Sequence, residues 1–305
     1  LRQGWFVYMK FDVVVTNPPF EDTNNRGKTQ HKIWIDFTKL CFSSLLKDGG
    51  LLCQVSPSSF MSPSSKVLQL FKQKCLTEIH LDISKHFPNI GSSFAYYNLW
   101  NKLNDNCKTT IYNEAGKHNI VLTDDVFYIP CDFCKESYSI HKKVIFKTKD
   151  KLPVKKDYVT CHNILLKDKN SILSKTKTVK HIYPIFHTNK QIWYSSKKQD
   201  FSNKKKVMWT RSGYTKPFYD AGIYGTTDMG YYILVDTEAE GKNLNHNLNL
   251  KLFKYIFKTA KWSGFGNEKI FSSLPVIPFD KKLTDKEMFD FFKLTKSERL
   301  YVDGY

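Results

Sequence analysis

Apolar and polar residues alternate in regular blocks along the first third of the chain. Residues 11–16 (FDVVVT) form an apolar run without polar alternation, which predicts a short, fully buried strand. Over residues 31–50 apolar positions recur at helical spacing, and the two glycines that close this segment predict the end of a helix. Residues 51–55 (LLCQV) predict a second buried strand, and a proline suited to a first helical turn predicts a helix that begins near Ser62.

A third strand and a hairpin complete this pattern. Residues 78–83 (EIHLDI) predict the strand, and residues 92–100 and 108–112 predict the hairpin. Strands and helices in this order are typical of an α/β layered sheet. In such sheets ligands bind beyond the carboxyl ends of the strands, so the segment that follows residues 11–16 is predicted to lie at a ligand-binding edge.

The pattern changes in the second third of the chain. Short aromatic strands, lysine clusters and glycines replace the regular blocks, which places a domain boundary between residues 115 and 130. We therefore expect an α/β domain over residues 1–120 and a mixed α+β domain over residues 121–305.

The formal net charge of +18 is the strongest signal in the composition. Such an excess indicates a polyanionic partner, most simply nucleic acid. No apolar run approaches the ~18 residues of a membrane-spanning helix, and no signal peptide is recognisable. We therefore expect no membrane partner.

The seven cysteines are scattered through the chain, several of them in apolar runs. This odd number and wide spacing predict reduced thiols in a cytosolic compartment. Cys131 and Cys134 (CDFC) have a spacing found in metal sites, but no second tight pair accompanies them, so no metal is expected.

The NPPF segment, residues 17–20, follows the first predicted strand directly. It resembles motif IV of the adenine-specific DNA methyltransferases that use S-adenosyl-L-methionine (AdoMet), in which Asp, Asn or Ser precedes two prolines and an aromatic residue. Residues 32–60 are similar to the helix, Gly-Gly turn, strand and proline segment that follow motif IV in the gamma-type enzymes, and residues 87–100 resemble their motif VIII region. The resemblance extends over residues 8–112 and is closest to the branch allied to combined restriction-modification methylases.

This resemblance implies a partial Rossmann-like methyltransferase sheet, lacking its N-terminal strands, followed by a target recognition domain that binds double-stranded DNA. The implied reaction transfers a methyl group from AdoMet to the exocyclic amino group of adenine. It also implies a restriction-modification, viral or orphan methylation system in the cytoplasm of a bacterium or a virus-infected host cell.

Each residue of the NPPF segment has a physical role in such a reaction. The adenine amine is a poor nucleophile because its lone pair is delocalised into the ring, and two acceptors aimed at its protons localise that lone pair. Asn17 offers its side-chain oxygen and Pro18 its backbone carbonyl, which the rigid rings of Pro18 and Pro19 hold in place. Phe20 offers a flat face to the flipped base, and stacking of this kind is worth ~1–3 kcal/mol per base.

A second aromatic residue contacts the flipped base in the family that the sequence resembles. Phe94 is the first candidate for this role, and Tyr96 and Tyr97 are the others. Ordinary packing of aromatic side chains across strands explains the same three rings equally well, so both interpretations stay open.

The second half of the chain supplies lysine-rich candidates for DNA binding. Lysines recur at helical spacing over a predicted helix, residues 249–261, and a further helix is predicted to begin at a capping box formed by Thr284 and Glu287. Residues 209–220 (WTRSGYTKPFYD) have the composition of a loop that enters a groove. Such cations position DNA through its phosphates without reading its sequence, although a solvated surface charge is the simpler account of any single lysine. The candidates are Lys204, Lys205, Lys206, Arg211, Lys216, Lys251, Lys254 and Lys258.

The residues that hold AdoMet in this family are not recognisable in the sequence. A glycine-rich loop and an acidic residue precede motif IV in gamma-type enzymes, and nothing before residue 17 resembles either. Gly264 and Gly266 lack a strand-to-helix setting. We therefore expect a hydrophobic edge beside residues 11–16, a half-built cofactor pocket, and completion by a missing N-terminal segment or a separate subunit.

Three other functions stay open from the sequence. The same motif acts on RNA bases and on glutamine side chains of proteins, although the long basic second half disfavours glutamine. A truncated DNA-binding relic without catalytic activity is the third. A glycine-rich loop encoded directly upstream would distinguish the enzyme from the relic.

Overall fold

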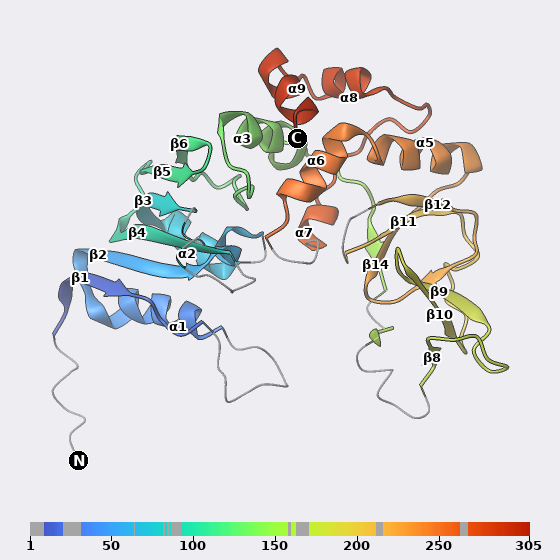
Figure 1. Cartoon of the computed structure of the whole chain (residues 1–305), viewed down its shortest axis with the longest axis horizontal. Helices are drawn as coiled ribbons and strands as arrows, with labels where there is room; N and C mark the ends of the chain where they lie inside the picture. The colour runs from blue at the N-terminus through green and yellow to red at the C-terminus, as the bar shows by residue number, and fades with distance from the viewer. Residues whose placement is uncertain are drawn as a thin grey trace. The chain divides into compact units, whose positions relative to one another are not determined.

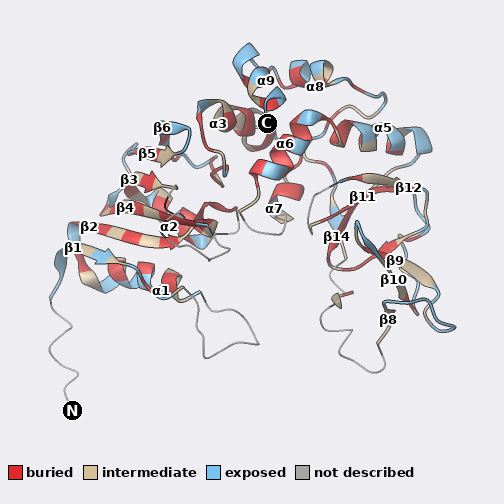
Figure 2. Ribbon diagram, in the orientation of Figure 1, coloured by how far each residue is buried: buried red, intermediate tan, exposed pale blue. Residues whose placement is uncertain are grey.

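The computed structural model divides the chain into two compact units, Leu1–Lys135 (unit 1) and Glu136–Tyr305 (unit 2) (Figure 1). Each unit has its own buried side chains, which form its core (Figure 2). The residues that the structure describes are 9–20, 32–63, 65–81, 83, 86, 93–157, 160–162, 171–211, 216–262 and 268–305.

Unit 1 is built on a six-stranded mixed sheet with the strand order β1-β2-β4-β3-β5-β6. The neighbours β1 and β2 are parallel, as are β3 and β5, whereas the other three neighbouring pairs are antiparallel. The predicted α/β class is confirmed. The strands are β1 (Phe11–Thr16), β2 (Leu46–Pro57), β3 (Lys74–His80), β4 (Phe94–Leu103), β5 (Lys108–Asn113) and β6 (Gly116–Val121).

The predicted hairpin between the segments that form β4 and β5 is wrong. β4 lies between β2 and β3, and β5 pairs with the other side of β3. Phe94, Tyr97 and Leu99 of β4 are almost fully buried, and a strand with buried side chains along its length is best placed in the middle of a sheet. β5 forms its hairpin with β6 instead, and Gly116 at that turn has a φ of 114°, which favours glycine.

β1 is the edge strand of the described sheet, and its apolar side chains are exposed. Phe11, Val13 and Val15 are 43%, 52% and 78% exposed. The prediction of a fully buried strand is therefore wrong, whereas the predicted hydrophobic edge is present in the described residues. An apolar edge of this kind is a template for pairing with a further strand.

The first helix of unit 1 ends earlier than the glycines predicted. α1 (Ile33–Leu40) continues as a wider π-type turn, Cys41–Leu45, and β2 begins at the next residue. Gly49 and Gly50 therefore lie inside β2, where Gly49 has a φ of 75°.

The second helix of unit 1, α2 (Lys66–Gln73), packs on β4. It begins after Ser65, whose hydroxyl accepts a hydrogen bond from the Val67 N–H at 3.2 Å. The ring of Phe71 contacts that of Tyr97, with centroids 4.5 Å apart. This contact holds the helix against the strand whose first residue is Phe94.

The boundary between the units lies beyond the predicted one because the segment after β6 packs on unit 1. The Asn113 amide of β5 donates a hydrogen bond to the carbonyl of Phe133 at 2.6 Å. Residues up to Lys135 therefore belong with the first sheet. The functional division near residue 120 stays a prediction.

One pair of cysteines in unit 1 forms a disulfide. Cys75 at the start of β3 and Cys107 just before β5 are joined, with their Cα atoms 5.3 Å apart. The prediction of reduced thiols is wrong for this pair, because the pairing of β3 with β5 brings together residues 32 positions apart in the sequence. Within the described ranges, no three His, Cys, Asp or Glu side chains gather as a metal site.

Unit 2 is mixed, with two four-stranded sheets in its described part, β13-β9-β10-β8 and β12-β11-β14-β7. Their strands are β7 (Lys155–Lys156), β8 (Leu173–Ser174), β9 (Tyr183–Thr188), β10 (Gln191–Ser195), β11 (Lys206–Thr210), β12 (Phe218–Asp220), β13 (Gly225–Thr226) and β14 (Gly230–Leu234). The helices are α3 (Lys135–His141), which starts at the boundary, α5 (Glu238–Leu248), α6 (Lys251–Thr259), α7 (Glu268–Phe271), α8 (Asp285–Phe291) and α9 (Lys296–Asp303).

Two helix predictions for this half are confirmed. The lysine-rich helix is present as α6, and the capping box of α8 forms as the sequence indicates. The Thr284 hydroxyl accepts from the Glu287 N–H at 3.2 Å, and the Glu287 carboxylate accepts from the Thr284 N–H at 2.8 Å. The backbone hydrogen bond from Thr284, together with the hydrogen bonds from the Lys281 and Thr284 side chains, lowers the pKa of Glu287 to about 2.

Across the described ranges, each helix is too short or too polar to span a bilayer.

We expect Phe71→Ala to lower the free energy of unfolding by about 3–5 kcal/mol, because it removes a fully buried ring from between Phe60 and Tyr97. Chemical denaturation followed by tryptophan fluorescence measures the change. Phe37→Ala removes the same ring from a site on α1 that is 36% exposed, so it should cost much less. Equal losses in the two variants would contradict this account of the core.

Candidate functional site

The NPPF segment leaves the sheet at the carboxyl end of β1. The parallel register pairs Thr16, the last residue of β1, with Gln54 of β2, so the segment emerges beside the end of β2. Asn17 is exposed and Pro18 is buried. The sequence thus places a side-chain amide in solvent on a backbone that the following proline ring anchors.

The two aromatic residues predicted for base binding lie against each other. The rings of Phe20 and Phe94 are stacked, with centroids 5.1 Å apart and an angle of 29° between their planes. Phe20 is half-buried, whereas Phe94 is 2% exposed. The fold therefore brings together two residues that are far apart in the sequence.

Phe94 is held in this place by the junction of β2 and β4. It pairs with Pro57 at the end of β2, and the Ser58 N–H donates to the carbonyl of Ser93 at 2.9 Å. A base sandwiched between two rings needs ~7 Å between their planes, about 3.5 Å on each side. Because the rings of Phe20 and Phe94 touch, this geometry makes Phe94 a support for Phe20 rather than an opposite wall.

The other two aromatic candidates are engaged elsewhere. Tyr97 is fully buried and contacts Phe60 and Phe71, as ordinary core packing requires. The Tyr96 ring stacks on His80 with centroids 4.0 Å apart. Phe94 is thus the one of the three predicted rings that the structure places on Phe20.

The described part of unit 1 does not fit AdoMet by itself. A glycine-rich turn between a strand and a helix is the element expected to approach the cofactor. Gly49 and Gly50 lie inside β2, and a Cβ at Gly50 would meet backbone oxygens of Phe11 and Lys47 at 3.0–3.1 Å. Gly116 is in the β5–β6 turn. These glycines have structural roles in the sheet, and none of them forms a cofactor-binding turn.

Lys206 must be removed from the predicted DNA contacts. Its ammonium lies 2.6 Å from the Asp220 carboxylate, and both side chains are 0% exposed. Burial lowers the pKa of Lys206, and the hydrogen bond to Asp220 opposes this effect. A buried ammonium with its own counterion cannot reach a phosphate, and sequence reasoning missed this because Asp220 comes from the neighbouring strand β12.

Three other candidates surround one hollow in unit 2. Lys216, which precedes β12, and Lys254 and Lys258 of α6 line a cavity of about 970 Å³. We name this the lysine cavity, and its lysines are Lys216, Lys242, Lys254, Lys258, Lys261 and Lys282.

The remaining candidates lie apart from the lysine cavity's lining. Lys204 and Lys205 are exposed in the loop before β11, and Arg211 is half-buried directly after β11. Lys251 pairs with Asp303 of α9 at 2.6 Å. Such an exposed pair leaves Lys251 accessible, although part of its charge is balanced.

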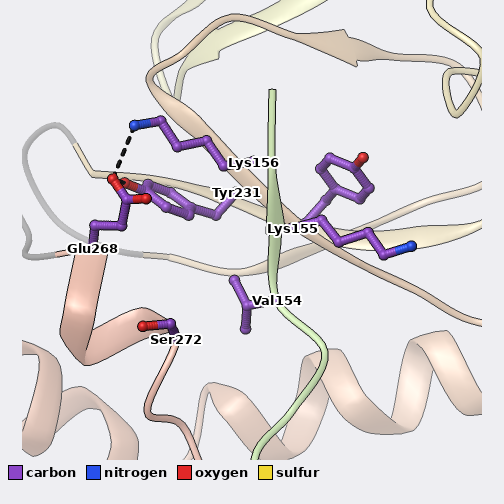
Figure 3. Close-up of a pocket in the computed structure, with 7 residues that line it drawn as sticks. Val154, Lys155, Lys156, Tyr231, Glu268 and Ser272 are labelled. Carbon is purple, nitrogen blue, oxygen red and sulfur yellow. Dashed lines mark hydrogen bonds and ion pairs between the residues drawn. The ribbon is translucent and has the colours of Figure 1, made fainter. Parts of the chain in front are cut away.

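A smaller pocket of about 320 Å³ lies where β7 and β14 meet α7 (Figure 3). Lys156 points to Glu268, whose carboxylate is 3.0 Å from its ammonium, and the Tyr231 hydroxyl donates to the same oxygen at 3.4 Å. Lys155 extends to the other side, as the next residue of a strand does (Figure 3). Because Glu268 balances Lys156, this pocket has no strong attraction for an anion.

A cluster of His162, His187, Trp193 and Asp228 in unit 2 was not predicted. His162 Nδ1 lies 2.7 Å from an Asp228 oxygen, and the His187 ring stacks on Trp193 with centroids 3.8 Å apart. Burial lowers the pKa of His187 to about 4, so this ring is neutral at pH 7. These residues come from separate segments without a common spacing, so no sequence pattern indicates the cluster.

Part of the chain matches a known protein family. Residues 3–94 match the Eco57I restriction-modification methylase family, and this segment contains both Phe20 and Phe94. No curated protein matches the chain.

Solved structures similar to the chain include three restriction-modification proteins. The M protein of the type I restriction enzyme EcoKI is 20% identical with a TM-score of 0.29, and the match covers 34% of this chain and 25% of that one. The type IIL restriction-modification enzyme MmeI in complex with DNA is 9% identical with a TM-score of 0.43, and the match covers 87% of this chain and 46% of that one. A nuclease-deletion mutant of the type ISP restriction-modification enzyme LlaGI in complex with a DNA substrate mimic is 12% identical with a TM-score of 0.45, and the match covers 87% of this chain and 40% of that one. The chain thus spans less than half the length of each.

We expect Lys206→Met to lower the free energy of unfolding by about 3–5 kcal/mol, because it leaves the Asp220 carboxylate buried without its counterion. The double variant Lys206→Met/Asp220→Leu removes both charges and should recover part of this loss, because the backbone groups that the two side chains bind still lose their partners. Thermal and chemical denaturation of both variants measure the difference. A double variant less stable than the single one would show that the ion pair does not act as described.

Proposed function

We propose that this chain carries the base-binding and DNA-contacting parts of an AdoMet-dependent, adenine-specific DNA methyltransferase of a restriction-modification system. The contact between Phe20 and Phe94 is the observation that carries the proposal, because it joins the NPPF segment to the second predicted base-binding residue. The match of residues 3–94 to a restriction-modification methylase family supports it independently.

In this proposal unit 1 grips the target base from the NPPF segment. The exposed Asn17 amide oxygen and the Pro18 carbonyl accept hydrogen bonds from the adenine amino group, which localises the nitrogen lone pair for attack on the methyl group. The flipped base stacks on the outer face of Phe20, whose inner face rests on Phe94. A rigid ring in this position needs no rearrangement when the base arrives.

The methyl donor is proposed to be held by further polypeptide that pairs with β1. The apolar side chains along this edge support the proposal, since Val13 and Val15 are more than half exposed. Helix α1 lies beside β1 (Figure 1), and it carries two further exposed apolar residues, Phe37 (36% exposed) and Leu40 (44% exposed). A strand added in parallel to β1 would cover this surface and bring a cofactor loop to the carboxyl end of the sheet.

A non-catalytic DNA-binding protein is the second candidate function. The lack of fit between the described residues and AdoMet favours it, because a chain without a site for the methyl donor would bind DNA without methylating it. Detection of methyl transfer, with or without a completing polypeptide, separates the two candidates.

We expect Asn17→Ala to abolish methyl transfer and to leave DNA binding unchanged, because it removes one of the two acceptors for the amino group. Radiolabelled AdoMet and unmodified mixed-sequence DNA are incubated with the chain, in the presence of the polypeptide that completes β1, and label is measured in N6-methyladenine. Asn17→Asp keeps an acceptor oxygen and should retain part of the activity. Undiminished labelling by Asn17→Ala would refute the proposed role.

Phe20→Ala is expected to reduce kcat/KM more than tenfold, about 1.4 kcal/mol, because the flipped base loses its stacking face. Phe20→Trp preserves an aromatic face and should keep most of the activity. Steady-state methylation assays compare the two variants. If both variants are equally active, the base does not stack on this ring.

A further inference from the structure

The lysine cavity of unit 2 has a volume of about 970 Å³ and is lined by six lysines, which packing of the core does not require. Its six lysines come from four places in the sequence: the segment before β12, helix α5, helix α6 with the residues just after it, and the segment before α8. None of its twelve described lining residues is acidic. Lys242 pairs with Glu238 of the same helix at 2.6 Å, so part of this charge is balanced within the protein. Lysines four apart on one helix face, such as Lys254 and Lys258, repel each other, which favours an anion bound near them.

The cavity presents its charges toward solvent. Lys216, Lys254 and Lys282 are exposed, and they stand above a floor that includes Phe218 and Phe257. Lys258 also lies over the ring of Tyr305, 4.3 Å from its centroid, which holds this ammonium in place. The side chains of Lys216, Lys254 and Lys282 are therefore accessible to an anion from solvent.

Three polar side chains that line the cavity each use one group in a contact within the protein. His246 Nε2 lies 2.9 Å from the carbonyl of Leu283, and the Asn249 amide donates to the carbonyl of Pro217 at 3.0 Å. The Asn245 side-chain oxygen accepts from Asn249 at 3.0 Å. These contacts hold the polar side chains in place, and the surplus of positive charge around them suits the repeating phosphates of a nucleic-acid backbone.

The spacing of the lysines agrees with a backbone. Lys254 and Lys258 are separated by about 6 Å along the axis of α6. Lysines one helical turn apart can reach neighbouring phosphates of one DNA strand. Lys216 and Lys282, from other segments, widen the charged surface beyond what one compact anion needs.

We propose that the lysine cavity seats the sugar-phosphate backbone of duplex DNA and contacts several consecutive phosphates independently of sequence. The proposal rests on the proposed function, because it takes DNA as the partner, but it concerns binding alone and requires no methyl donor. It also assigns a role to Lys282, which the sequence did not single out.

The test compares two triple variants of the full chain that carry the same change in charge. Lys216→Ala/Lys254→Ala/Lys282→Ala removes exposed lysines of the cavity, and Lys180→Ala/Lys286→Ala/Lys296→Ala removes exposed lysines elsewhere in unit 2. Fluorescence anisotropy with a labelled mixed-sequence duplex is measured between about 50 and 200 mM salt. Circular dichroism and thermal denaturation establish that both variants are folded.

We expect the cavity variant to lose roughly tenfold or more in affinity at the lowest salt. The slope of log affinity against log salt concentration should become shallower by about 2–3, because each of the three lost phosphate contacts contributes about 0.9 to the slope. The control variant should change the slope by less than ~1. Equal changes in the two variants overturn the proposal, because net charge alone would then explain binding.

A second arm uses ATP as the probe. If wild-type chain binds ATP, the cavity variant does not, and the two proteins have equal affinity for the duplex, the cavity belongs to a small anion and the proposal is overturned. Duplex binding that depends on the cavity, without any methylation of adenine, would support DNA binding by the lysine cavity and refute the proposed methyltransferase activity. The two proposals can therefore be refuted separately.

Discussion

The parallel pairing of β1 with β2 is the constraint on which the candidate site depends. β1 is hydrogen-bonded to one described neighbour only, and the pairing of Thr16 with Gln54 fixes where the chain leaves the sheet. The end of β2 is in turn joined to the start of β4 by the hydrogen bond between Ser58 and Ser93. Three neighbouring strands thus converge at one end of the sheet, and the contact of Phe20 with Phe94 follows from this convergence.

Local patterns predicted the elements of this site, and long-range pairing decided how they are used. The strand, the proline turn after it and helix α6 depend on neighbouring residues, so the sequence indicated them correctly. The position of β4, the disulfide of Cys75 and the burial of Lys206 depend on residues from other strands. Periodicity carries no information on these partners, and each of those predictions was wrong.

Lysine side chains in unit 2 occupy two different environments, one buried and one exposed. Lys206 is enclosed with Asp220 and ties β11 to β12, so it contributes to the architecture of the sheet. Lys254 and Lys282 stand at the rim of a hollow and keep their charge in water. The sequence shows the same residue type in both places, and only the packing of the neighbouring strand or helix distinguishes a buried, structural cation from an exposed one.

The exposed apolar edge at β1 has a consequence for the chain inside a cell. A strand that is paired on one side only among the described residues, with side chains such as Val15 in water, can add to any compatible edge, including that of an identical molecule. The amount of usable protein then depends on how quickly this edge is covered, relative to self-association and to capture by chaperones and proteases. If the proposed completing polypeptide is a separate chain, its supply relative to this one would set how much of the protein escapes aggregation.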